Sequence, residues 1–305
     1  MPAPFHDPVP GRSAGAPLPG AAPIQRLGDE TVHECVALAV DREWQPDGHK
    51  WQLLFEHGEV WGVRDDDGAL IGTTTATRFG DVVAIGNVLV ARRAEGNGIG
   101  RRLMEHVLTR HGGAVVILNA TVFGRPLYEK LGFQVVGSTH THRGVFVPDA
   151  GEPGVASLDA AESRARPATP EDLPAIARLD AEAYGANREP LLRRVTTSFA
   201  DAACVSERGG VVTGFGARWS NGGHSQLGPL LAAGDAEAVA VITALAQGVE
   251  GELRVDLNDR DTALRAWASG HGLHETGVSA LMVRGADAFP GVRAGWYSAL
   301  MQAIG

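Results

Sequence analysis

The sequence predicts an α/β (α+β) protein in two parts, each a mixed, mostly antiparallel sheet flanked by helices. Apolar spacing switches repeatedly between helical and strand-like periods, and the same order of helices and strands occurs twice. A small, polar, Pro- and Gly-containing stretch at residues 149–165 separates the two passes. The length of 305 residues also exceeds that of one usual domain.

The elements of the first pass follow from spacing and turn residues. Apolar residues at helical spacing predict helices, whereas Asp/Gly turns between apolar runs predict strands. In order, these are helices over 31–44 and 50–57, three strands within 60–90, a helix whose apolar positions run from Ile99 to Leu108, a strand over 114–120, a helix over 123–133 and a strand over 134–147.

The second pass repeats that order at low sequence identity, which indicates an internal duplication. Its segments span 169–184, 189–199, 203–219, 225–232, 235–247, 252–258, 262–273 and 274–285. Beyond it, residues 289–305 are expected to end as a short apolar helix. The predicted organisation is a mobile Pro/Gly/Ala-rich tail (1–23), a first domain (24–148), a linker (149–165), a second domain (166–286) and a C-terminal extension (287–305).

Composition narrows the class of protein. The net charge of −9 and the absence of a basic run argue against nucleic acid and anionic membranes as partners. The first residues lack the pattern of a secretion signal, and no apolar run approaches the roughly 18 residues that span a bilayer. Cys35 and Cys204 are too few for a disulfide framework and read as core residues. We therefore expect a cytoplasmic protein.

The stretch "EGNGIGRRLM" at residues 95–104 places three glycines at the start of a helix. A helix N-terminus exposes backbone N–H groups and a partial positive charge, so a glycine loop there can hold a phosphate. The dinucleotide-binding fingerprint is excluded because Arg101 stands where its third glycine belongs and no acid follows in "LNATV". The nucleotide-triphosphate loop is excluded because its lysine is missing.

This loop after a strand, followed by "PLYEKLGF" at residues 126–133, resembles the GCN5-related N-acetyltransferase (GNAT) family. The resemblance implies that acetyl-CoA, or another short acyl-CoA, is the co-substrate and that Tyr128 is the general acid. The cofactor-binding positions that it implies are Val88, Leu89, Val90, Arg93, Glu95, Gly96, Asn97, Gly98, Ile99, Gly100, Arg101 and Asn119.

The chain departs from the family pattern in three places. Glu95 stands where the family usually has Arg or Gln, a change for which the neighbouring arginines are candidates to compensate. The strand before the loop, "AIGNVLV", has no carboxylate to serve as base beyond Asp81 at its start. In the second pass only Gly234 remains of the glycine loop, and Ala268 stands where the tyrosine should be. The chain thus resembles tandem family members with a degenerate second half.

The resemblance implies transfer of the acetyl group to an amine, and we expect that amine to be a primary amine of a small molecule, including amines of natural-product or antibiotic type, with direct transfer in a ternary complex. The alternatives are acetylation of protein lysines or N-termini, and a non-catalytic CoA-binding or scaffold role. His140, His142 or water is the expected base, and no metal site is expected. The oligomeric state, including a homodimer, stays open. The expected substrate contacts are Trp44, Trp51, Tyr184 and Arg188.

Overall fold

The computed structural model describes residues 22–148 and 164–305, and the predicted tail and linker lie almost wholly outside these ranges. The two passes contain the same elements in the same order, each opened by a short strand. The first half comprises β1 (Ile24–Arg26), α1 (Val32–Asp41), α2 (Gly48–His57), β2 (Glu59–Arg64), β3 (Leu70–Phe79), β4 (Val82–Val90), α3 (Ile99–Arg110), β5 (Val115–Ala120), α4 (Arg125–Lys130) and β6 (Gln134–Gly144).

The second half repeats this plan, which confirms the predicted duplication of element order. It comprises β7 (Arg164–Pro167), α5 (Leu173–Tyr184), α6 (Glu189–Arg194), β8 (Ala202–Arg208), β9 (Val211–Asn221), β10 (His224–Ala232), α7 (Asp235–Ala246), β11 (Leu253–Asn258), α8 (Thr262–Gly270) and β12 (His274–Arg284). Short helical turns are η2 (Asp29–Thr31), η3 (Arg92–Ala94), η5 (Pro170–Asp172), η6 (Val195–Phe199) and η7 (Arg293–Gly295).

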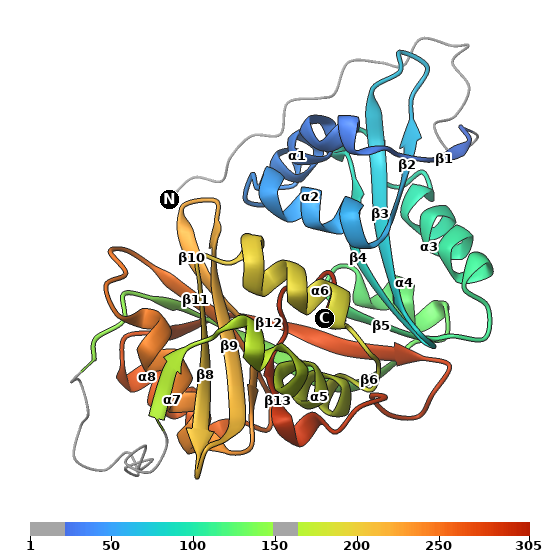
Figure 1. Ribbon diagram of the computed structural model, residues 1–305. Helices are drawn as coiled ribbons and strands as arrows, with labels where there is room; N and C mark the ends of the chain where they lie inside the picture. The colour runs from blue at the N-terminus through green and yellow to red at the C-terminus, as the bar shows by residue number, and fades with distance from the viewer. Residues whose placement is uncertain (1–21, 149–163) are drawn as a thin grey trace.

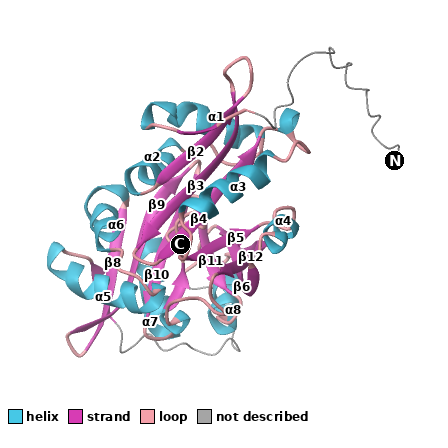
Figure 2. Ribbon diagram, turned by 90° about the vertical axis from the view of Figure 1, so that its right-hand side faces the viewer, coloured by secondary structure: helices cyan, strands magenta, loops and turns pink. Residues whose placement is uncertain are grey.

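The strands of both halves form one sheet of 13 strands, in the order β1-β2-β3-β4-β5-β12-β6-β11-β13-β10-β9-β8-β7. The predicted fold class, a mixed and mostly antiparallel sheet flanked by helices, is confirmed. Among the strands of the described residues, only the β4–β5 and β10–β11 pairs are parallel. Helices α1 and α2 cover one face of β2 to β4 and α3 covers the other (Figures 1 and 2).

The two halves exchange their last strands. Strand β12 of the second half pairs with β5, with Ala280 opposite Ala120. Strand β6 of the first half lies between β12 and β11, with Thr141 opposite Asp256. Figure 1 shows β6 and β12 crossing the middle of the molecule side by side. Each half therefore completes the sheet of the other.

The C-terminal residues do not form the predicted apolar helix. Instead, β13 (Trp296–Ser298) is a strand that inserts between β10 and β11, and a turn follows it. The prediction was wrong because β10 and β11 leave backbone groups unpaired where they separate, and an extended segment can bond to both. Residues 299–301 are buried in the same core as Ile85 of β4 and Trp219 of β9.

Candidate functional site

The glycine loop lies between β4 and α3, where a bound molecule can approach the backbone. Gly98 caps α3 with a φ of 75° and a ψ of 6°, and Gly96 also has a φ of 75°. A side chain would be strained at such a positive φ, which favours glycine. A Cβ built at either position meets nothing within 4 Å, so the space above the loop is open.

The backbone N–H groups of this loop are available to a ligand. Among the described residues, none of the N–H groups of residues 96–101 donates to a protein acceptor. The side chain of Asn97 holds the loop by donating to the carbonyl oxygens of Ala94 (3.0 Å) and Glu95 (3.1 Å). Free N–H groups and the positive end of the α3 dipole form a cradle for an anion, so these residues fit the pyrophosphate of an acyl-CoA.

The charge of Glu95 is compensated by a residue that sequence reasoning did not consider. Its carboxylate pairs with Arg42, at the end of α1, at 2.5 Å. The neighbouring arginines that the sequence analysis considered as partners for Glu95 bind other groups. Two of them, Arg93 and Arg101, are also predicted cofactor contacts. Arg92 pairs with Glu43, Arg93 with Asp65, Arg101 with Glu105, and Arg102 donates to the carbonyl of Ala22.

Strands β4 and β5 separate toward the loop. They pair only from Val82–Ile85 to Val115–Leu118. Beyond this point one edge of residues 88–90 is bonded to β3, and the other edge has no ladder partner among the described strands. Asn87 stands at the separation with a φ of 46°, where the β3–β4 register shifts. The wedge between the strands exposes backbone groups that a pantetheine amide can bind.

A cavity of about 410 Å³ opens where β4 and β5 part, and both halves line it. We call it the acceptor cavity. Lining residues from the first half include Trp44, Lys50, Gly86, Asn87, Asn119 and Thr121. Those from the second half include Trp219, Gln226, Arg254, Asp256, Ser279 and Gln302. A volume of this size suits a small organic molecule.

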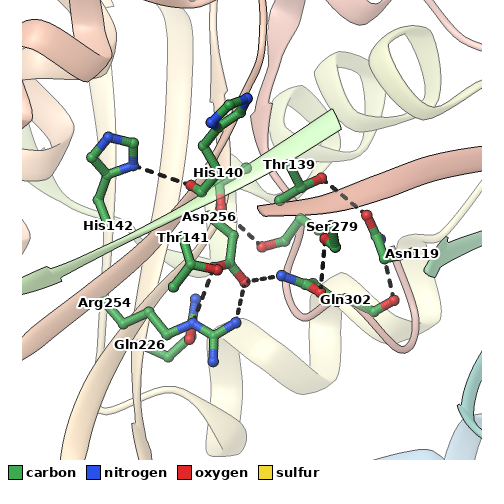
Figure 3. Close-up of polar contacts among 12 residues, drawn as sticks. Asn119, Thr139, His140, Thr141, His142, Gln226, Arg254, Asp256, Ser279 and Gln302 are labelled. Atoms are coloured by element: carbon green, nitrogen blue, oxygen red, sulfur yellow. Dashed lines mark hydrogen bonds and ion pairs between the residues drawn. The ribbon is translucent and has the colours of Figure 1, made fainter. Parts of the chain in front are cut away.

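The carboxylate of Asp256 organises one wall of the acceptor cavity (Figure 3). It accepts hydrogen bonds from Thr141 Oγ1 at 2.8 Å, Arg254 Nε at 3.0 Å and Gln302 Nε2 at 3.1 Å. The side-chain oxygen of Gln302, Oε1, accepts a hydrogen bond from Ser279 Oγ at 3.2 Å. Because each of these side chains is hydrogen-bonded to another, the network fixes their positions in the absence of a ligand.

Residues 301–303 reach the cavity from the end of the second half and complete this wall. Asn119 at the end of β5 accepts from Thr139 Oγ1 at 3.0 Å and donates to the Gln302 carbonyl at 3.4 Å. Ala303 packs directly on Gly86 of β4. The predicted cofactor contact Asn119 therefore lies in the acceptor cavity, at the wedge between β4 and β5, and not at the glycine loop.

Tyr128 lies on α4, a short helix that begins beside a proline. Its ring is buried at 8% exposure and packs edge-on against Phe133, with ring centroids 6.0 Å apart. Burial is the one cause of the shift in its pKa, and no hydrogen bond to its hydroxyl contributes among the described residues. Burial raises the pKa of Tyr128 to about 12, so the phenol keeps its proton at every working pH. The residue does not line the acceptor cavity.

His140 and His142 share a face of β6, but it is the face turned away from the acceptor cavity. Side chains alternate along a strand, and Thr139 and Thr141 take the cavity side (Figure 3). His140 bonds Glu275 at 2.9 Å on the opposite side. His142 is 1% exposed, and burial lowers its pKa. This placement gives neither imidazole a path to an amine in the cavity.

Of the predicted substrate contacts, only Trp44 lines the acceptor cavity. Trp51 is a core residue at 1% exposure. Tyr184 and Arg188 are buried beneath the second half, where Arg188 binds Asp180 through Nε at 2.9 Å and Nη2 at 2.6 Å. Its third donor is bound to the Gly305 carbonyl at 2.7 Å. All three guanidinium nitrogens of Arg188 are thus engaged within a side chain that is 1% exposed, so Arg188 stabilises the fold and is not open to a substrate, which corrects the expectation.

The corresponding groove of the second half is filled by the protein itself. Strand β13 occupies the wedge between β10 and β11, with Ser298 opposite both Leu230 and Leu257. The first turn of α7 carries Asp235 and Glu237, whose charges oppose an anion at that helix N-terminus. The wedge and the helix start that are open in the first half are thus closed in the second.

Sequence reasoning missed most residues of the acceptor cavity. Asn87 gave a signal, since a lone amide inside the apolar strand "AIGNVLV" is unusual for a buried strand. Lys50, Arg254, Asp256 and Gln302 gave none, because they lie on elements far apart in the chain and meet only through the strand exchange.

Within residues 22–148 and 164–305, no group of three His, Cys, Asp or Glu side chains is arranged to hold a metal ion. The helices of these same segments are too short or too polar to cross a membrane.

Comparison with known proteins adds to this geometry. A family model described as an acetyltransferase (GNAT) domain matches residues 56–135, and a second model with the same description matches residues 176–298. A curated relative from Bacillus subtilis (strain 168), the uncharacterized N-acetyltransferase YitH, is 28% identical over 252 residues, which cover 82% of this chain and 87% of the relative.

Solved structures share the fold across both halves. A putative acetyltransferase from Pyrococcus horikoshii superposes with a TM-score of 0.76 at 15% identity, covering 97% of this chain and 99% of that one. A tandem GNAT protein from the clavulanic acid biosynthesis pathway has a TM-score of 0.61 at 13% identity, covering 86% of this chain and 97% of that one. With a GNAT match in each half, the chain belongs to the GNAT family as a tandem of two such domains and is an acyl-CoA-dependent N-acetyltransferase.

Proposed function

We propose that the protein transfers the acetyl group of acetyl-CoA to the primary amine of a small molecule held in the acceptor cavity. The observation that carries this proposal is the shape of the cavity. It holds about 410 Å³ and has walls from both halves, whereas an acetyltransferase of protein lysines needs a groove open to a peptide. Trp219 and Gln302 of the second half are among the residues that line this cavity.

The first half provides the acyl-CoA site in this proposal. The free N–H groups of residues 96–101 hold the pyrophosphate, and the unpaired edge of Val88–Val90 holds the pantetheine arm. The thioester then lies at the wedge near Asn87, on the border of the acceptor cavity. GNAT enzymes use acetyl-CoA as co-substrate, and the open cradle at Gly96 and Gly98 fits it.

The reaction requires one bond to form and one to break. The amine nitrogen attacks the thioester carbonyl carbon, the C–N bond forms, and the C–S bond breaks to release the CoA thiolate. Tyr128 is our candidate to give its proton to that sulfur, because burial keeps the phenol protonated and no protein group takes up its hydroxyl.

The amine loses its proton to water in this scheme. The cavity carboxylates are occupied, since Asp256 pairs with Arg254 and Glu43 with Arg92. His140 and His142 lie on the wrong face of β6. The rate at low substrate concentration should then rise about tenfold per pH unit below the pKa of the amine itself, because only its neutral form attacks.

The second half, in our proposal, shapes the acceptor cavity and binds no cofactor. It contributes β12 and the wall formed by residues 301–303, while its own groove is filled by β13. This role accounts for the presence of a GNAT fold without the glycine loop or the tyrosine.

Release of free thiol from acetyl-CoA, measured across a panel of small amines and a lysine-containing peptide, tests the proposed function. We expect turnover with members of the small-amine set and none above background with the peptide. Preference for the peptide would identify a protein acetyltransferase instead. Thiol release without any acetylated amine by mass spectrometry would contradict the proposal as well.

A further inference from the structure

Four charged side chains line the acceptor cavity, and one of them forms no direct ion pair among the described residues. Glu43 pairs with Arg92 at 2.5 Å, and Asp256 pairs with Arg254 at 2.9 Å. Lys50 has no carboxylate oxygen within 4.0 Å among the described residues. Lys50 is therefore the one charged side chain of the cavity without a direct ion pair among the described residues, although Asp47 lies close enough to raise its pKa.

The fold directs Lys50 to this place. The side chain of Asp47 caps α2 by accepting the backbone N–H of Lys50 at 3.1 Å, which fixes the first turn of the helix. Burial lowers the pKa of the Lys50 ammonium, Asp47 raises it, and the Arg254 guanidinium lowers it further. A half-buried ammonium near a guanidinium is an unfavourable arrangement that an anion would relieve.

Two more donors on the same cavity lack an acceptor. Arg254 uses Nε and Nη2 on Asp256, and its Nη1 bonds to no described residue. Asn87 is 5% exposed, and its Nδ2 is buried without a partner. A buried amide N–H without an acceptor costs about 1–3 kcal/mol. Together with Lys50, the cavity offers three N–H donor groups that a ligand with acceptor oxygens would satisfy.

We propose that the acceptor amine carries an anionic group, a carboxylate or a phosphate, that binds between Lys50 and Arg254. Arg254 then binds both Asp256 and the ligand, and Lys50 gains the direct ion pair that no described carboxylate supplies. The amine end of the molecule points toward Asn87 and the wedge. This inference rests on the proposed function and adds the substrate class.

Pairs of amines that differ only in charge test the anion. The probes are glycine, β-alanine, 4-aminobutanoate and 6-aminohexanoate, each with its neutral amide, and phosphoethanolamine with ethanolamine. Since a hydrogen bond to a charged group contributes about 1.5–3 kcal/mol, we expect kcat/KM to favour the best anionic member by roughly 10- to 100-fold. The preferred series distinguishes a carboxylate from a phosphate.

Variants at Lys50 assign the preference to this site. Lys50→Met should bring the ratio of anionic to neutral probe close to one, and Lys50→Arg should keep most of it because the charge remains. The chain has two lysines, so Lys130→Met is the matched control. Lys130 is exposed on α4 and should behave like wild type.

Chemical labelling of the lysines tests anion binding at the same site without depending on catalysis. A small amine-reactive acylating agent is applied with and without each probe, and the acylation of Lys50 and Lys130 is followed by peptide mass spectrometry. Anionic probes should slow the labelling of Lys50 and leave Lys130 unchanged. Protection without turnover would uphold the anion site and reject the proposed transfer. Turnover that depends neither on the charge of the probe nor on the residue at position 50 would uphold the proposed transfer and reject the anion site. The inference is overturned if neither kinetics nor labelling separates anionic from neutral amines.

Discussion

The wall formed by residues 301–303 rests on Gly86, and a single added methyl group tests its importance. A Cβ built on Gly86 lies 2.5 Å from both Cα and Cβ of Ala303 and 2.8 Å from its carbonyl oxygen. Carbon atoms in van der Waals contact lie about 3.5–4.0 Å apart. Gly86 does not have a positive φ, so alanine fits the backbone there and the strain comes from this contact alone.

Gly86→Ala should therefore push residues 302 and 303 outward by about 1 Å. Three hydrogen bonds of Gln302 are then weakened: those with Asp256 (3.1 Å), Ser279 (3.2 Å) and Asn119 (3.4 Å). Overpacking costs about 1–3 kcal/mol, and each hydrogen bond contributes about 0.5–1.5 kcal/mol net. We expect a loss of roughly 2–4 kcal/mol in the free energy of unfolding and an acceptor KM raised about tenfold or more.

Urea unfolding and steady-state kinetics with varied amine measure these effects, and calorimetry with CoA should show unchanged affinity because the glycine loop is untouched. Gly270→Ala, at the end of α8, is the control, since its Cβ would meet nothing within 4 Å. Adding Ala303→Gly should restore little, because two of the three closest atoms are backbone. A Gly86→Ala protein with wild-type stability and acceptor KM would refute the assignment of this wall.

Three further predictions concern the cofactor site, the acid and the response to pH. Calorimetry should find one CoA site per chain, and two sites would contradict the role of β13 in closing the second groove. Gly98→Trp should abolish CoA binding by filling the open cradle, and normal binding by this variant would contradict the role of the loop. Tyr128→Phe should lower kcat by about 100-fold without changing CoA affinity, and near wild-type turnover would exclude Tyr128 as the acid. Burial and the nearby Arg143 and Arg254 lower the pKa of His224 to about 4, so the unfolded chain binds its proton first as the pH falls. The native state should accordingly lose about 3 kcal/mol between about pH 7 and pH 4. His224→Leu should flatten that decline in urea unfolding, and an unchanged slope would show that His224 is not its source.

The order of elements and the cofactor loop were accessible from the sequence because their signals are local. Apolar spacing at 60–90 predicted three strands, and β2, β3 and β4 lie there. The positive φ at Gly96 and Gly98 favours glycine through local backbone geometry, so the loop could be recognised from its glycines alone. The pairing of His140 with His142 on one face was also correct, since alternation is a property of the single strand.

What faces the substrate was decided only by tertiary structure. The identity of a strand's neighbours depends on contacts between distant segments, so no local pattern indicated that β12 would pair with β5, or that β13 would fill the second groove. The side of β6 that borders the acceptor cavity follows from that pairing, which turns Thr141 toward the cavity and His142 away. Lys50 and Arg254 are about two hundred residues apart and meet across the same exchange. Local chemistry thus specified the glycine loop, and long-range strand pairing specified the cavity beside it.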